Sequence, residues 1–221
     1  MNPKQTAKEP RRKAVSIRTL MSGLRADYPD ATCSLRHENA LQLLVATVLS
    51  AQCTDERVNI VTRSLFEEYR TARDYAESPP GKLEQEIRST GFFNSKARSI
   101  RGLARAIIER YGGEVPGSME ELLTLPGVAR KTANVVLGNA FDVAAGITVD
   151  THVLRLSQRM GLSQETTPVK VEQDLMALIP RRDWVYFGHA MIQHGRNVCQ
   201  ARKPACAVCR FRRTCPGRQD A

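Results

Sequence analysis

The stretch that determines the fold is SMEELLTLPGVARKTANVVLGNAFDVAAGITVD, residues 118–150. Ser118, followed three residues later by Glu121, forms the pattern of a capping box and predicts the start of a short helix. Pro126-Gly127 ends that helix, because proline cannot continue it and glycine permits a tight turn. A second helix is predicted from Arg130, since apolar residues then recur at the helical period. The sequence therefore predicts a helix, a hairpin and a second helix.

The hairpin has the chemistry of an anion-binding site. The first backbone N–H groups of the second helix have no acceptor within the helix, and the helix dipole places positive potential there. Gly127, Ala129, Arg130 and Lys131 lie at or beside this helix start. A phosphate of a nucleic acid fits such a site.

The composition favours a polyanionic partner. The chain has 221 residues and a formal net charge of +10, a balance typical of proteins that bind nucleic acid. No apolar run approaches the roughly 20 residues of a membrane span, and no signal peptide is recognised, so no membrane association is expected. Residues 1–14 are polar and basic and predict a disordered tail.

The rest of the chain predicts an all-α fold. Almost no stretch alternates with a period of two, whereas apolar residues recur at the helical period in most segments. The sequence TGFFNSK, residues 90–96, is predicted as a loop. Helices are expected over residues 15–28, 40–49, 55–69, 97–111, 150–160, 168–179 and 184–197, with one short helix within 75–88 after the break at Pro79-Pro80-Gly81.

Four cysteines near the C-terminus predict a metal site. They follow the spacing C-x6-C-x2-C-x5-C and are Cys199, Cys206, Cys209 and Cys215. Four thiolates at this spacing can bind one zinc ion or one iron–sulfur cluster, and the spacing alone does not separate the two. Two disulfides are the alternative, but no feature of the chain marks it as secreted. Basic side chains interleave with the cysteines, among them Arg210, Arg212 and Arg213.

Four features together resemble the endonuclease III family. They are LPGVARKTANVV from Leu125, VDTH from Val149, LSAQCTD from Leu49 and the four-cysteine loop. The resemblance runs from about Val15 to Cys215 and implies a bifunctional DNA glycosylase/AP lyase of the helix-hairpin-helix superfamily. The family binds a [4Fe–4S] cluster at this cysteine spacing, so the resemblance favours that cofactor over zinc.

The same resemblance implies two domains. A six-helix domain is expected over residues 33–143 and a cluster domain over residues 144–221, which the N-terminal helix at residues 15–32 joins. In the family the active site lies in the cleft between the two domains, so the same place is expected here.

The resemblance assigns the chemistry to two residues. Lys131 matches the family's nucleophile, an amine that attacks the sugar C1′ and forms a Schiff base from which the 3′ phosphate is eliminated. Asp150 matches the carboxylate that stabilises positive charge on the sugar as the base departs. The amine must be neutral to attack, and partial burial together with the positive helix end is expected to favour that form.

The resemblance also implies DNA contacts. The target nucleotide must leave the duplex. Gln52 matches the family's wedge residue facing the orphaned base, and Phe92 stands where relatives commonly have leucine. Ala129 replaces the second glycine of the common hairpin. Further contacts are expected from Gly127, Arg130, His152, Arg210, Arg212 and Arg213, and from Ser50, Asn94, Lys96 and Thr151.

We therefore expect an enzyme that removes oxidised pyrimidines from double-stranded DNA containing damaged bases or abasic sites. The resemblance implies a monomer in the cytoplasm of a bacterium, associated with the nucleoid. Two alternatives stay open. One is a monofunctional glycosylase of the same superfamily, against which Lys131 argues. The other is a non-catalytic DNA-binding module, which would form no imine with abasic DNA.

Overall fold

The computed structural model describes residues 14–219, and all regular elements in that range are helices, which confirms the all-α prediction. The expected N-terminal tail, residues 1–14, lies outside the described residues except for Ala14. The α-helices are α1 (Ile17–Asp27), α2 (Ala40–Leu49), α3 (Asp55–Glu68), α4 (Ala72–Ala76), α5 (Lys82–Glu86), α6 (Phe93–Tyr111), α7 (Met119–Leu122), α8 (Arg130–Ala140), α9 (Thr151–Arg159), α10 (Pro168–Leu178) and α11 (Trp184–Asn197). Two 3₁₀ helices, η1 (Arg88–Thr90) and η2 (Arg181–Asp183), complete the set. Within residues 14–219, none of these helices has the length and apolar character needed to cross a membrane.

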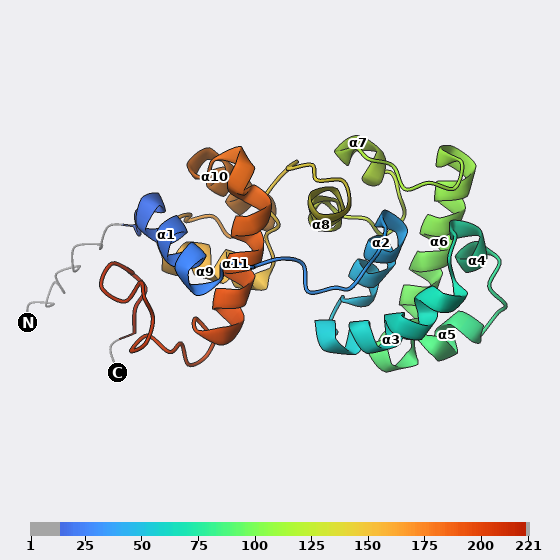
Figure 1. The fold of residues 1–221 in the computed structure, drawn as a ribbon, viewed down its shortest axis with the longest axis horizontal. Coiled ribbons are helices and arrows are strands. Elements are labelled where there is room, and N and C mark those ends of the chain that lie inside the picture. Colours follow the sequence, from blue (N-terminus) through green and yellow to red (C-terminus); the bar gives the residue numbers. More distant parts are fainter. Residues whose placement is uncertain (1–13, 220–221) are drawn as a thin grey trace, which may run out of the picture. The chain divides into compact units, whose positions relative to one another are not determined.

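Tertiary contacts divide the chain into two units (Figure 1). The hairpin unit spans Thr32–Thr148 and contains α2 to α8. The terminal unit combines Met1–Ala31 with Val149–Ala221, so α1 packs with helices from the other end of the chain. The sequence analysis placed the second boundary at residue 143. Residues 144–148 belong with the hairpin unit in the structure, where the carbonyl of Ile147 accepts a hydrogen bond from the Asn134 side chain of α8 (3.5 Å).

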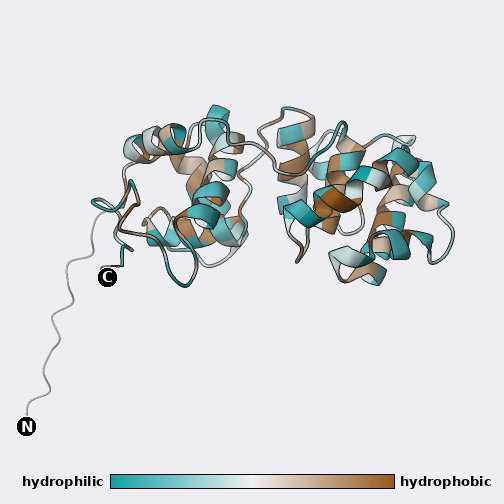
Figure 2. Cartoon of the chain, turned by 60° about the horizontal axis from the view of Figure 1, so that its bottom comes forward, coloured by the Kyte–Doolittle hydropathy of each residue, from teal (hydrophilic) through white to brown (hydrophobic). Residues whose placement is uncertain are grey.

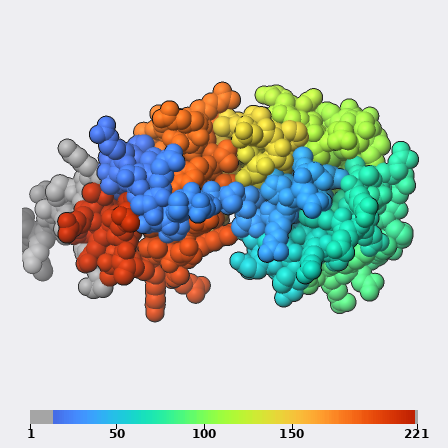
Figure 3. Space-filling model, in the orientation of Figure 1, coloured from blue at the N-terminus to red at the C-terminus, as the bar shows by residue number. Residues whose placement is uncertain are grey.

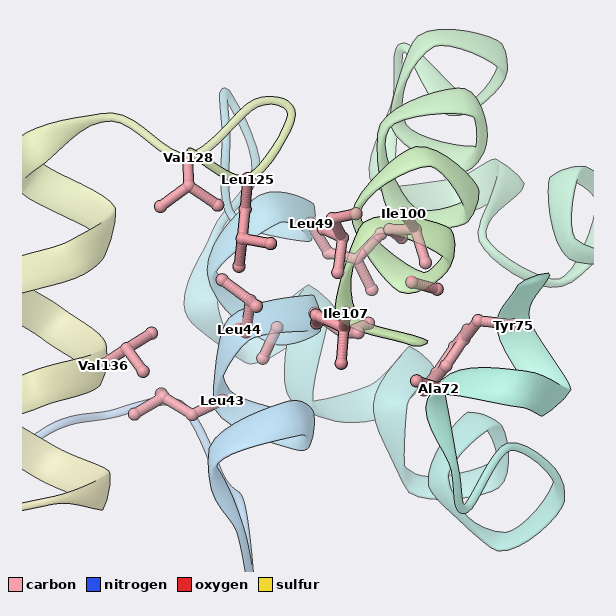
Figure 4. Packing of buried hydrophobic residues seen from close by; sticks show 14 of the residues in the cluster. Leu43, Leu44, Leu49, Ala72, Tyr75, Ile100, Ile107, Leu125, Val128 and Val136 are labelled. Atoms are coloured by element: carbon pink, nitrogen blue, oxygen red, sulfur yellow. The ribbon is translucent and has the colours of Figure 1, made fainter. Parts of the chain in front are cut away.

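The core of the hairpin unit is built around α2. Its near-continuous apolar sequence is explained by burial on all sides, since Leu43, Leu44 and Leu49 are 0% exposed. Figure 4 shows Leu49 beside Ile100 and Leu44 beside Ile107, both residues of α6. Burying each such leucine contributes about 1.5–3 kcal/mol relative to leaving it exposed. The core thereby fixes α2 and α6, the two helices that flank the predicted DNA-contacting loops.

The terminal unit joins the two ends of the chain. Leu20 and Leu24 of α1 are buried, and Figure 2 shows both hydrophobic and hydrophilic residues on the helices of this unit. Gly23 makes room for Phe211 of the cysteine loop, because a Cβ at this glycine would lie 2.4 Å from the Phe211 ring. The C-terminal segment accordingly lies against α1 (Figure 3).

Three helix boundaries differ from the prediction. α6 begins at Phe93, not at residue 97, because Phe92 takes a left-handed conformation (φ 48°) as its N-cap and the chain enters the helix four residues earlier. A helix also forms before the Pro79-Pro80-Gly81 break: α4 starts after Thr71, whose side chain forms a capping box with Asp74. α7 ends at Leu122, and the backbone N–H groups of Thr124 and Leu125 then form i→i−3 bonds to the carbonyls of Glu121 and Leu122.

Candidate active site and cysteine loop

The hairpin follows α7 and depends on a glycine. Ser118 caps α7 by accepting the backbone N–H of Glu121 (3.2 Å), and its hydroxyl donates to the Glu121 carboxylate (2.8 Å). Gly127 has φ +78°, a left-handed conformation that costs glycine little and other residues more. The backbone N–H of Val128 donates to the carbonyl of Leu125 (3.1 Å), and both side chains are buried. Burial of these two residues anchors the turn and leaves its tip exposed.

The N-terminus of α8 has no side-chain cap. Ala129 is the N-cap residue, with φ −93° and ψ 167°, and an alanine side chain provides no acceptor for the first-turn N–H groups. Since φ is negative, alanine fits here without the strain that a left-handed conformation would impose. The replacement of the family's glycine by Ala129 therefore leaves the backbone of the anion site intact.

Lys131 projects from the first turn of α8. Its side chain is exposed, whereas Ala133, Val136 and Leu137 on the opposite side of the helix are buried. The expectation that the protein itself partly buries this amine is wrong. The apolar face of α8 anchors the helix, and the amine stands at its positive end in solvent.

Asp150 caps the helix that follows it. Its Oδ1 accepts the backbone N–H groups of His152 and Val153 (2.8 Å each), and Val153 is fully buried. Among the described residues no hydrogen bond to Oδ2 is found. One oxygen of the carboxylate thus holds the start of α9, and the second oxygen is available for chemistry.

His152 is packed within the terminal unit. Its Nδ1 lies 3.2 Å from the Arg155 guanidinium, and a Cβ at Gly195 of α11 would approach the ring to 2.9 Å. The ring therefore has protein neighbours on two sides, and its contact with DNA stays a prediction.

The four C-terminal cysteines line one cavity together with residues such as Arg159 and His194. The empty space measures about 360 Å³, its open mouth included. All four are free and half-buried, so the disulfide alternative is wrong for the described chain. Within residues 14–219, no three His, Cys, Asp or Glu side chains converge as ligands of a metal ion. Burial raises the pKa of Cys209 and Cys215, which means that their thiolates need a positive partner.

Two arginines of α9 that the sequence analysis did not single out hold the cysteine loop. Arg155 donates to the carbonyls of Gly195 (3.0 Å) and Cys199 (2.9 Å). The Arg159 guanidinium lies 3.5 Å from the sulfur of Cys199. It also donates to the carbonyls of Gln200 and Ala201 (2.7 Å each). Their i, i+4 spacing on a helix that starts at Asp150 is the signal that could have identified them.

His194 is a third residue that was given no role from the sequence. It is 1% exposed, its Nε2 lies 3.6 Å from the sulfur of Cys209, and its Nδ1 lies 3.1 Å from the hydroxyl of Tyr28. Burial lowers its pKa, which favours the neutral ring. His194 therefore connects α1 and α11 with the cysteine cavity.

The predicted DNA contacts differ in their environment. Gln52 and Phe92 are exposed and both take left-handed conformations, with φ 52° and φ 48°. Arg212 and Arg213 are exposed, whereas Arg210 is ion-paired with Asp27 (2.6 Å). This ion pair already occupies the Arg210 guanidinium and leaves it less available to a phosphate.

One expected contact is wrong. Lys96 is 5% exposed, and its amine donates to the carbonyls of Leu49 and Thr90 (2.8 Å each). A lysine held in this way inside the hairpin unit does not reach a DNA phosphate.

Comparison with known proteins gives the family. Residues 45–181 match the HhH-GPD superfamily of base excision DNA repair proteins. Endonuclease III of Synechocystis sp. is 58% identical over 192 residues, which cover 87% of this chain and 88% of that protein. The chain belongs to the endonuclease III family. This family comprises DNA glycosylase/AP lyases, so the chain is a DNA repair enzyme, as the sequence predicted.

Solved structures of the endonuclease III family have the same fold. A non-covalent endonuclease III–DNA complex is 48% identical and superposes with a TM-score of 0.87, covering 91% of this chain and 94% of the other. A trapped endonuclease III–DNA covalent intermediate is 47% identical with the same TM-score and the same coverage. The two-domain helix-hairpin-helix glycosylase fold is thereby confirmed.

Proposed function

We propose that this enzyme removes oxidised pyrimidines from double-stranded DNA and then cleaves the strand at the resulting abasic site. The observation that carries the proposal is the exposed Lys131 in the first turn of a helix whose N-terminus lacks a side-chain cap. This arrangement provides an amine next to N–H groups that favour a phosphate. The covalent DNA intermediate trapped for a 47% identical relative supports a covalent mechanism.

Lys131 is the proposed nucleophile. Its neutral amine attacks C1′ of the damaged nucleotide, the N-glycosidic bond breaks, and the bonding electrons leave with the base. Loss of a proton from the amine and opening of the sugar give a Schiff base. β-Elimination then removes a proton from C2′ to a base such as water, forms the C2′–C3′ double bond and breaks the C3′–O bond, whose electron pair leaves with the 3′ phosphate. Because Lys131 is exposed in the free protein, we propose that the bound DNA itself removes the amine from water.

Asp150 is the proposed electrostatic partner. Positive charge develops on the sugar as the glycosidic bond lengthens, and a fixed carboxylate stabilises it. The N-cap bonds to His152 and Val153 hold Oδ1 in place. This leaves Oδ2 to face the developing charge or to accept the proton that the amine loses.

Gln52 and Phe92 are the proposed wedge residues. A base inside a duplex is out of reach of an active site, so the nucleotide must be extruded and the gap filled. Both side chains are exposed at the tips of turns, Phe92 by 67%. A phenyl ring can insert between bases, as apolar side chains do in other proteins that distort DNA.

A [4Fe–4S] cluster held by Cys199, Cys206, Cys209 and Cys215 fits the cysteine cavity. The cavity is lined by all four free cysteines, together with apolar residues such as Met160 and Val198 and with basic residues such as Arg159. The iron of a cluster would provide the positive charge that buried thiolates require, and four cysteine ligands leave no open position, so the cluster serves a structural purpose. Arg155 and Arg159 donate hydrogen bonds to backbone carbonyls of the loop that carries these thiolates.

We further propose that the enzyme acts as a monomer on DNA in the bacterial cytoplasm, in association with the nucleoid. The helix N-terminus of α8 and the exposed Arg212 and Arg213 support binding to the duplex backbone.

A substrate panel tests the proposal. Iron-loaded protein is incubated with duplexes that carry an oxidised pyrimidine, an oxidised purine or a mismatched adenine, and released base and strand cleavage are measured separately. We expect both products from oxidised pyrimidines. Release of mismatched adenine without cleavage would instead indicate a monofunctional glycosylase.

A further inference from the structure

Lys96 occupies an electrostatically unfavourable position in its helix. It occupies the first turn of α6, where the positive end of the helix dipole disfavours a cation. The side chain is also 5% exposed, and burying an amine is costly unless its N–H groups find acceptors. The surrounding structure must therefore compensate for this position.

The compensation comes from two carbonyl groups. The Lys96 amine donates to the carbonyl of Leu49 (2.8 Å), the last residue of α2, and to the carbonyl of Thr90 (2.8 Å), the last residue of η1. Carbonyl oxygens at helix C-termini have no N–H donor within the helix and lie at the negative end of the dipole. Burial lowers the pKa of Lys96, but an ammonium and a neutral amine both have enough N–H groups for two bonds.

The residues that carry these two carbonyls directly precede the two turns that contain the proposed wedge residues. Gln52 follows Leu49 by three residues, and Phe92 follows Thr90 by two. Both take left-handed conformations (φ 52° and φ 48°), which are uncommon for residues other than glycine. Such conformations persist where the surrounding structure enforces them. A single amine thus bonds to the base of each of the two turns.

We propose that Lys96 is a positioning residue that holds the Gln52 turn and the Phe92 turn at a fixed separation. The role rests on the proposed function, because it presupposes that the two side chains enter the duplex. Two wedges preset by one buried amine lose little conformational freedom when they insert, and this reduces the cost of extruding the nucleotide. Lys96 does not touch the DNA in this account.

Lys96→Met tests the proposal, because methionine has a similar length and no donor. We expect single-turnover excision from lesion duplex to fall about tenfold, as the loss of hydrogen bonds from a charged group predicts. Borohydride trapping on single-stranded abasic DNA should stay within about twofold of the unaltered enzyme, since an unpaired nucleotide needs no extrusion. Amide hydrogen exchange should rise in residues 50–53 and 91–93 and not in the hairpin at residues 125–129.

Two further variants keep the test decisive. Lys82→Met removes an exposed lysine that pairs with Glu68 outside both turns and should behave as the unaltered enzyme, because surface ion pairs contribute little. Lys96→Gln retains a donor for one of the two carbonyls, so its loss of duplex excision should be smaller than that of Lys96→Met. This variant replaces Lys96→Met in the test if Lys96→Met does not fold.

The outcomes separate the two proposals. An unaltered enzyme that neither excises nor traps contradicts the proposed function itself. If the unaltered enzyme is active and the Lys96 variants excise from duplex as fast, the positioning role is wrong. It is also wrong if they lose activity equally on duplex and on single-stranded abasic DNA.

Discussion

The helices that carry Lys131 and Asp150 begin in opposite ways. α8 starts at Ala129 with no side-chain acceptor for its first N–H groups. α9 starts at Asp150, whose carboxylate accepts two of them at 2.8 Å. The same backbone feature, a helix N-terminus with a positive dipole end, is open to an external anion in α8 and occupied by the protein's own anion in α9.

This difference assigns a distinct chemistry to each helix start. The open end favours a phosphate and leaves the Lys131 amine beside it, whereas the capped end holds a carboxylate rigidly while one of its oxygens stays free. The two helices also differ in the contacts that hold them in place. α8 is held by its buried apolar face, including Val136, whereas α9 is in addition tied to the cysteine loop through Arg155 and Arg159.

The largest effect is expected from removing the charge at the capped end. Asp150→Asn keeps an oxygen that accepts both N–H groups, so unfolding free energy should fall by less than about 1 kcal/mol. Base excision should fall roughly 10²–10³-fold, because the sugar cation loses its counter-charge. Single-turnover excision and urea unfolding measure the two quantities.

Asp150→Ala is the matched control. It removes charge and cap together, so it should lose excision to the same extent and about 1 kcal/mol more stability than Asp150→Asn. Normal excision by a folded Asp150→Asn variant would show that the carboxylate serves only as a cap.

Removing a ligand of the proposed cluster should affect the capped helix and spare the open one. Cys206→Ser is expected to lose iron and loosen the loop that Arg155 and Arg159 hold. The amides of α9 should then exchange about ten- to a hundredfold faster, as the loss of a few hydrogen bonds predicts, while those of α8 should change little. Iron analysis and hydrogen exchange measure the result. Equal acceleration in both helices would contradict the difference in support.

Adding a cap to the open end should make α8 resemble α9. Ala129→Asp introduces an acceptor and a negative charge, so the protein should gain about 0.5–1 kcal/mol of stability and bind DNA about fivefold more weakly. Ala129→Ser provides the cap without the charge and should gain stability with a smaller loss of affinity. Unchanged DNA affinity in Ala129→Asp would argue against a phosphate at this helix start.

The smallest effect is expected at the exposed arginines. Arg212→Glu should lower DNA affinity about threefold at moderate salt and reduce the steepness of its salt dependence by about one phosphate. Arg210→Glu should change the salt dependence less, because Asp27 already pairs with Arg210. A larger effect at Arg210 than at Arg212 would mean that DNA displaces Asp27.

Much of the fold could be predicted from the sequence because its signals are local. The apolar run of α2 and the start of α8 after Pro126-Gly127 both occur where expected. The helix start at Phe93 was missed because it depends on a left-handed Phe92, and phenylalanine gives no local signal for that conformation.

The environment of two predicted DNA-contact residues could not be predicted, because it depends on distant partners. From the sequence, Lys96 is expected to be a surface cation. In the structure its buried amine donates to the carbonyl of Leu49, which is 47 residues away in the sequence. From the sequence, Arg210 is expected to be an unpaired charge. In the structure it pairs with Asp27, which is 183 residues away in the sequence. Periodicity does not encode such contacts, which only tertiary packing brings together.

The central claim is that Lys131 at the open helix end is the nucleophile. The most direct test is borohydride trapping on abasic DNA with Lys131→Gln, which removes the amine and keeps a side chain of similar length. Asp150→Asn, checked in parallel for folding and iron content, retains the amine and should still be trapped. We predict a covalent enzyme–DNA product for the unaltered enzyme and for Asp150→Asn, and none for Lys131→Gln. Trapping of a folded Lys131→Gln variant at the unaltered rate would place the nucleophile elsewhere and contradict the account.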